Sequence, residues 1–171
     1  MQDAVDAITM QWAAARPDVD VSPLGVAGRL SRAVRLLERS TKEFFAEHGL
    51  EPWEFDMLAT LLRDPEHTMC MKDLAATALV SPGALTNRMD RLVERGLVRR
   101  WPLESNRRMV LVALTEQGER LAADLLTLHV AHEADLLSAL SPTDQEALTE
   151  TLRKLLVSLG DTPFRMGEHL P

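Results

Sequence analysis

The sequence is poor in several residue types that mark particular classes of protein. It has one cysteine, Cys70, and no tyrosine, and aromatic residues make up only 4% of its 171 positions. A single thiol excludes an internal disulfide framework and is typical of proteins from reducing compartments. No apolar run approaches the roughly 20 residues of a membrane-spanning helix, and the N-terminus has no basic leader. We therefore expect a cytoplasmic protein with no membrane partner.

Sequence motifs for catalysis and for metal binding are also missing. There is no nucleophile elbow, no phosphate-binding loop and no HExxH motif, so we expect no enzymatic activity and no cofactor. His129 and His132 have a spacing that can bind zinc, and Glu133 follows them, but no convincing third and fourth ligands accompany this group. We interpret both histidines as interface or surface residues and expect no metal site.

The distribution of charge matters more than its total. The net charge of −7 argues at first against a nucleic-acid partner. Between Thr86 and Arg108, however, seven arginines stand against three acidic residues, a local charge of +4 that leaves −11 on the rest of the chain. Phosphates respond mainly to the local field, and an acidic remainder discourages non-specific binding. The pattern is therefore compatible with DNA binding through one basic segment.

The apolar periodicity predicts a mainly α-helical chain that forms a single domain over residues 1–171. The segments 1–48 and 115–160 carry long apolar stripes, with more hydrophobic helix surface than a small domain can cover. We therefore expect these N- and C-terminal helices to form the dimerisation region of a homodimer. The tail, 161–171, is expected to be loosely held.

The central segment, 52–114, has the pattern of a winged helix-turn-helix. A short helix over 71–79 is followed by a tight turn at 80–81 and a second helix that starts at Ser81–Pro82 and ends at Gly96. The apolar residues of the second helix recur at helical spacing and predict one buried face: Leu85, Met89, Leu92 and Val93. The opposite face is polar: Gly83, Asn87, Arg91 and Glu94.

A β-hairpin, the wing, is predicted after this helix. Strands are expected over 97–101 and 109–114, joined by a turn over 102–108 whose tip carries Arg107 and Arg108. A helix of this kind can enter the major groove while the hairpin tip reaches the flanking backbone or the minor groove. The alternative is an ordinary helix and hairpin with a solvated arginine face.

Individual DNA contacts follow from this geometry. Base edges or close backbone approach are assigned to Gly83, Thr86 and Asn87. Phosphates or the minor groove are assigned to Ser81, Arg91, Arg107 and Arg108.

The text LTNRMDRLVERGLVRRWPLESNRRMVLVALTEQG resembles the MarR family of transcriptional regulators, and the resemblance covers nearly the whole chain. It implies a mostly helical dimer with one winged helix-turn-helix per subunit, which typically represses a nearby gene until a small molecule, the effector, binds. One position departs from the family pattern. Asn106 stands where the family usually has an aspartate that helps to orient the basic residues of the wing.

A narrower resemblance, to the urate-responsive branch of PecS and HucR type, rests on QWAAARPDVDVSPL, EFDMLATL, TNRMDRL and LVRRWP. It implies that four residues bind the effector: Trp12, Asp56, Arg88 and Arg100. Helical geometry alone places Arg88 on the helix flank near the buried sector, where a guanidinium beside a carboxylate and an indole can hold a flat anion such as urate. The alternative is a core tryptophan and a structural Asp56–Arg88 ion pair.

We therefore expect a homodimeric repressor that reads a pseudo-palindromic operator in double-stranded DNA and is released by urate or a related planar purine anion. Three alternatives stay open. The effector could be a phenolic compound, the protein could respond to redox state or metal, or it could bind DNA without any effector. A redox role for Cys70 would require a depressed thiol pKa and a suitable neighbouring group.

Overall fold

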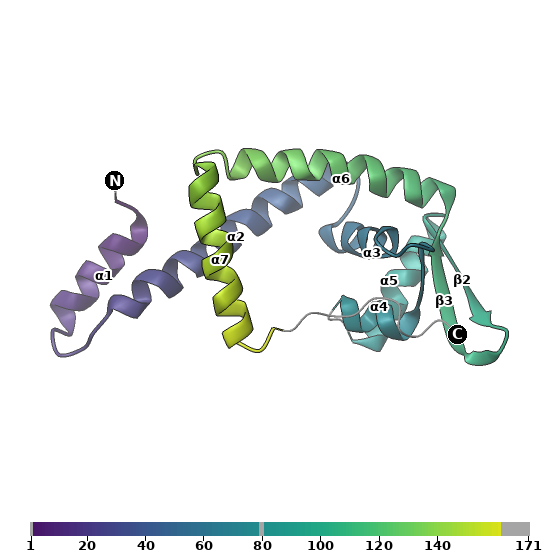
Figure 1. The fold of residues 1–171 in the computed structure, drawn as a ribbon, viewed down its shortest axis with the longest axis horizontal. Coiled ribbons are helices and arrows are strands. Elements are labelled where there is room, and N and C mark those ends of the chain that lie inside the picture. The colour runs from purple at the N-terminus through teal and green to yellow at the C-terminus, as the bar shows by residue number, and fades with distance from the viewer. Residues whose placement is uncertain (1, 79–80, 162–171) are drawn as a thin grey trace. The chain divides into compact units, whose positions relative to one another are not determined.

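The computed structural model describes residues 2–78 and 81–161 and is mainly α-helical, as the sequence predicts (Figure 1). Its elements follow in the order α1 (Ala4–Ala15), α2 (Ser22–Glu47), α3 (Pro52–Leu62), β1 (Thr68–Cys70), α4 (Met71–Thr77), α5 (Pro82–Glu94), β2 (Val98–Leu103), β3 (Asn106–Leu114), α6 (Glu116–Leu136) and α7 (Pro142–Ser158). Among the helices of these ranges, none combines the length and the apolarity needed to cross a membrane. The chain divides into two compact units, one up to residue 47 and one from residue 48 onwards.

Local signals in the sequence set the limits of α5. The Ser81 hydroxyl accepts a hydrogen bond from the backbone N–H of Ala84, and Pro82 occupies the first turn, where no donor is needed. At the other end Gly96 has φ +68°, a left-handed conformation that favours glycine. The predicted helix is confirmed. The predicted end of the preceding helix at residue 79 and the turn residue 80 lie outside the described residues.

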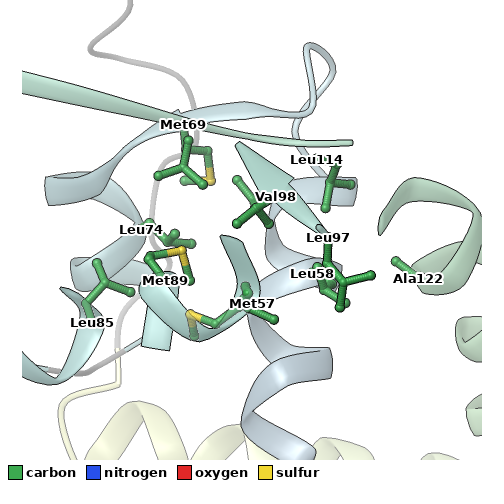
Figure 2. Close-up of a cluster of buried hydrophobic side chains, with 13 residues drawn as sticks. Met57, Leu58, Met69, Leu74, Leu85, Met89, Leu97, Val98, Leu114 and Ala122 are labelled. Carbon is green, nitrogen blue, oxygen red and sulfur yellow. The ribbon is translucent and has the colours of Figure 1, made fainter. Parts of the chain in front are cut away.

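The core of the second unit is a cluster of buried side chains from α3, α4, α5, the sheet and α6 (Figure 2). From α5 it takes Leu85, Met89 and Leu92, each exposed to 1% or less, so the predicted buried face is largely confirmed. Val93 was predicted to share that face but is 37% exposed. At 100° per residue it lies about 80° from Leu85, at the edge of the buried sector, where the last turn of α5 reaches the surface.

The three strands form one antiparallel sheet in the order β1-β3-β2. The sequence did not predict β1, because three residues are too few to show an alternating pattern. The wing differs from its prediction as well. The predicted turn over 102–108 is wrong, since β2 continues to Leu103, which lies opposite Asn106 at the start of β3. Pro102 can lie within β2 because that strand is at the edge of the sheet.

This correction moves the two arginines of the wing. Arg107 and Arg108 lie in the first residues of β3 rather than in the turn, and both are exposed. The pairing register is irregular here, because Leu103 pairs with Asn106 and Pro102 pairs with Val110, so both arginines lie in a bulged stretch between two paired positions.

The start of α6 is fixed against the wing. The Thr115 hydroxyl donates to the Gly96 carbonyl oxygen at 2.7 Å and accepts from the Gly118 N–H at 3.1 Å. Gly118 lies so close to the backbone of Leu97 that a Cβ added there would be 1.9 Å from the Leu97 carbonyl oxygen. A glycine is thus required for α6 to begin beside the first strand of the wing.

Several apolar stripes predicted from the sequence are open to solvent. Helix α7 buries none of its residues, and Leu148, Leu155 and Leu156 are 38–49% exposed. In the first unit α1 packs on α2 and buries Val5, whereas the predicted stripe of α2 leaves Val26 65% exposed. The helices form as predicted, but the residues that the structure describes do not cover their apolar faces.

Substituting Gly118 tests the close approach of α6 to the wing. We expect Gly118→Ala to lower the free energy of unfolding by about 1–3 kcal/mol, because the new methyl group forces a backbone shift in a packed region. Denaturant unfolding at a fixed protein concentration measures the change. Gly83→Ala is the matched control, since no atom lies within 4 Å of the added Cβ. Equal stability of the two variants would contradict the packing described for Leu97 and Gly118.

Candidate nucleic-acid interface and effector site

The outer face of α5 is open and polar. The side chains of Asn87 and Arg91, which were predicted to contact DNA, are exposed, and so is that of Thr86. Nothing lies within 4 Å of the position that a Cβ would take at Gly83, so the backbone can approach another molecule closely there. The burial of Leu85 and Met89 on the opposite side keeps this face turned outward (Figure 2).

Asn106 shapes the beginning of β3. Its side-chain oxygen accepts a hydrogen bond from the backbone N–H of Arg108 at 3.2 Å. An amide oxygen in this position can make the same backbone contact as a carboxylate, although it carries no charge. Asn106 therefore holds the backbone that presents Arg108, even though it departs from the family pattern.

The C-terminal end of α5 is tied to the start of α3 by a buried carboxylate. The Oε2 atom of Glu54 lies 2.8 Å from Nη1 of Arg95, and the Glu54 side chain is 2% exposed. The second guanidinium nitrogen of Arg95 donates to the Gly49 carbonyl oxygen at 3.1 Å. The Arg95 side chain is 39% exposed, so solvent screens this pair more than a fully buried one. No pattern in the sequence had indicated this contact.

Two of the predicted effector residues are neighbours. Although Asp56 on α3 reaches solvent, burial among the surrounding atoms raises the pKa of its carboxyl group. The charges of His129 from α6, Arg88 from α5 and Arg63 oppose that rise and lower the pKa. Asp56 is thus within electrostatic reach of Arg88, but in the described part of the chain no ion pair within 4.0 Å joins the two.

An aromatic residue beside this pair was not predicted. The Arg88 guanidinium carbon lies 5.3 Å from the centroid of the Trp53 ring, and that of Arg91 lies 4.8 Å from it. Trp53 precedes Asp56 by three residues on α3, so both side chains project on the same side of that helix. That spacing is the sequence signal that could have identified Trp53.

His129 belongs to the same neighbourhood. Its ring packs edge-on against Phe55, with the centroids 5.3 Å apart, and its Nε2 lies 3.2 Å from the Glu133 carboxylate. The side chain is 15% exposed. His129 was interpreted from sequence as an interface or surface histidine, and in the structure it is also among the groups that act to lower the pKa of Asp56.

Arg100 lies on the other flank of α5. Its Nη2 is 2.6 Å from the Asp90 carboxylate. Asp90 and Arg88 are two residues apart, about 200° around the helix, so their side chains point to opposite flanks. The predicted effector residues of the second unit are therefore separated. Asp56 and Arg88 lie on one flank of α5, while Arg100 lies on the other flank, where it pairs with Asp90. Trp12 belongs to the first unit, where it is 50% exposed.

A cavity of about 880 Å³ adjoins Arg100. Polar groups from α5 and the wing, those of Thr86, Arg100 and Arg108, contribute to its wall. Apolar side chains supply much of the remaining wall: Met71, Ala75, Leu85, Met109 and Val110. Cys70, Lys72 and Asp73 complete the wall, so the cationic groups outnumber the one carboxylate. Such a space suits a small molecule that is largely hydrophobic and carries an anionic group.

Cys70 and the histidines give little support to a redox or metal response. The Cys70 thiol donates a hydrogen bond to the Asp73 carboxylate at 2.9 Å, and burial, with Asp73 adding to the effect, raises the pKa of that thiol. A raised pKa disfavours the reactive thiolate. Within residues 2–78 and 81–161, no group of three or more histidine, cysteine or acidic side chains is arranged to hold a metal ion.

Comparison with known proteins agrees with this geometry. The sequence profile described as the MarR family matches residues 48–109. The regulator PecS of Dickeya dadantii is 36% identical over 152 residues, which cover 88% of this chain and 92% of PecS. The crystal structure of AbsC, a MarR family regulator from Streptomyces coelicolor, is 27% identical with a TM-score of 0.73 and covers 82% of this chain and 97% of its own.

A second solved structure contains DNA. A mutant MarR from E. coli complexed with operator DNA is 27% identical with a TM-score of 0.68, and the match covers 81% of this chain and 99% of that one. The relatives are regulators of transcription and not enzymes. This chain therefore belongs to the MarR family and is a DNA-binding transcriptional regulator similar to PecS.

Proposed function

We propose that this protein represses a nearby promoter as a homodimer and leaves its operator when urate or a related planar purine anion binds. One observation carries the proposal. Helix α5 presents Asn87 and Arg91 to solvent, while Arg88 on its shoulder lies over Trp53 and within electrostatic reach of Asp56. A single rigid helix thus bears both the surface for DNA and a cationic group for an effector.

The homodimer is supported by the apolar surface that a single chain leaves open. Helix α7 buries none of its residues, and Leu128 of α6 and Leu37 of α2 are 47% and 42% exposed. A second copy would cover such faces with the same residues through a two-fold axis. Two copies of α5 would then read pseudo-palindromic half-sites about one helical turn apart.

The proposed effector matches the chemistry of the predicted residues. A guanidinium such as that of Arg88 can donate two hydrogen bonds to the anionic edge of a purine. Arg100, which was predicted for the same site, pairs instead with Asp90 on the opposite flank of α5. An anion that binds Arg88 and is repelled by ionised Asp56 shifts α5 and changes the spacing between half-sites. By linkage, DNA weakens effector binding in the same proportion.

A phenolic acid is the second candidate effector. The cavity of about 880 Å³ beside Arg100 is lined largely by apolar side chains and offers Thr86 as a polar partner. Such a wall fits an aromatic ring with one carboxylate better than it fits a polar purine. A thermal-shift screen of purines and phenolic acids distinguishes the two, because the ligand that binds the folded protein raises its melting temperature.

The effector role of Arg88 is tested by Arg88→Ala. We expect this variant to bind DNA from the upstream region of its own gene, and we expect release by urate to require at least about tenfold more urate, since a charge-assisted bidentate contact is lost. Gel-shift titration with and without urate measures both properties. Arg63→Ala is the matched control, because Arg63 also acts on Asp56 but is the C-cap residue of α3 and not part of α5. A full urate response in Arg88→Ala would remove Arg88 from the effector site.

The wing contacts are tested by replacing Arg107 and Arg108 together with alanine. Each phosphate contact contributes about 0.9 to the slope of log affinity against log salt, so losing two contacts flattens the slope by about 1.8. Fluorescence anisotropy over a range of salt concentrations measures it. Replacing Arg120 and Arg153 with alanine makes the same change in net charge on α6 and α7 and serves as control. An unchanged slope in the wing variant would show that these arginines do not contact phosphates.

The environment of Asp56 predicts a pH dependence of stability. Because the pKa of Asp56 is raised in the folded protein, its carboxyl group contributes stability below its ordinary pKa, and that contribution is lost as pH rises through the raised value. Asp56→Asn removes this dependence. Relative to wild type, we therefore expect the melting temperature of the variant to rise between about pH 4 and pH 7. A difference that is constant with pH, or that has the opposite sign, would contradict the environment described for Asp56, His129, Arg88 and Arg63.

A further inference from the structure

Trp53 is shared by two arginines to which the proposed function gives different roles. Both guanidinium groups lie over its ring, that of Arg88 at 5.3 Å and that of Arg91 at 4.8 Å from the centroid. The arginines are three residues apart on α5, while the indole comes from the first turn of α3. One aromatic side chain therefore contacts both the predicted effector residue and a predicted phosphate contact.

The indole is well placed to make the two arginines depend on each other. Trp53 is half-buried and packs against the core cluster, so its ring is held in place. Each guanidinium is attracted to the ring electrons, and the two positive charges repel one another. When one arginine leaves the ring or loses its charge to a bound anion, the other is held more firmly.

We propose that Trp53 is the positioning residue that couples the effector to DNA binding. This inference rests on the proposed function for the identity of the effector, but the dependence between the two arginines does not require an effector. An anion bound to Arg88 neutralises that guanidinium and draws it from the indole. Arg91 is then the one of these two arginines that stays over the indole, and its cation–π contact is stronger. A DNA phosphate must break that stronger contact before it can bind Arg91. A phosphate that withdraws Arg91 has the converse effect on Arg88, as reciprocity of binding requires.

One consequence does not involve an effector. Arg88→Met removes the same charge that a bound anion neutralises, so it should reproduce part of the effector's action. Exposed cation–π contacts correspond to about two- to fivefold in an equilibrium constant, which sets the size of the expected loss in DNA affinity. Removal of a positive charge near DNA weakens binding as well, but that effect does not depend on Trp53.

A double-mutant cycle separates these two contributions. DNA affinity is measured without effector at one salt concentration for wild type, Trp53→Leu, Arg88→Met and the double variant. Arg88→Met is expected to weaken binding about two- to fivefold more in the wild-type background than in the Trp53→Leu background. Equal losses in the two backgrounds would overturn the proposal. Trp53→Phe keeps an aromatic face and is expected to give a smaller but non-zero difference, and it replaces Trp53→Leu if that variant does not fold.

A second arm uses urate as the probe. Trp53→Leu should reduce the factor by which urate weakens DNA binding by about two- to fivefold. The chain offers a matched control, because the Arg99 guanidinium lies 5.0 Å from the Trp101 ring centroid on the wing. Trp101→Leu removes one cation–π contact that involves neither Arg88 nor Arg91, and it should leave the urate factor unchanged.

The two arms distinguish failure of this inference from failure of the proposed function. If urate does not act on the wild-type protein but the cycle is non-additive, the urate assignment fails and the role of Trp53 stands. If urate releases wild type and Trp53→Leu equally and the cycle is additive, the role of Trp53 fails and the proposed function stands.

Discussion

The burial of one face of α5 is the constraint on which the rest of the structure depends. Leu85, Met89 and Leu92 are at most 1% exposed, and together they fix the rotation of the helix about its axis. Packing at crystal-like density permits little rotation, so every other residue of α5 has a defined direction. Gly83, Asn87 and Arg91 face outward because the leucines and the methionine face inward, and Arg88 and Asp90 are placed on the two flanks by the same rotation.

Polar contacts then attach α5 to its neighbours at three points. Arg95 meets the buried carboxylate of Glu54, Asp90 pairs with Arg100 of the wing, and the indole of Trp53 lies under two guanidiniums. Each contact joins the helix to a different part of the second unit. Arg95 reaches the first turn of α3, Asp90 reaches the sheet, and the two guanidiniums reach the face of α3 that carries Asp56. A ligand that disturbs one attachment acts on the orientation of the DNA-reading face, which is why a small anion could control a large interface.

The sequence predicted features set by neighbouring residues and missed those set by distant ones. The limits of α5 were predictable because a serine cap, a proline and a left-handed glycine act locally. The wing turn was placed wrongly, since pairing of Leu103 with Asn106 depends on the partner strand and not on the local pattern. Glu54 and Arg95 are 41 positions apart, and Trp53 is 35 and 38 positions from the two arginines it contacts. Helical or strand periodicity does not predict contacts between residues so far apart in the chain. The proximity of Asp56 and Arg88 was anticipated through family resemblance and the flank position of Arg88.

A glutamate scan of α5 tests the central claim most directly. Each position from 83 to 93 outside the buried face, except the already acidic Asp90, is replaced in turn by glutamate, folding is verified, and the DNA dissociation constant is measured at one salt concentration. The account predicts losses that repeat with the helical period of about 3.6 residues and are largest at Gly83, Asn87 and Arg91. Losses of similar size all around the helix, or a maximum on the flank of Asp90, would contradict it.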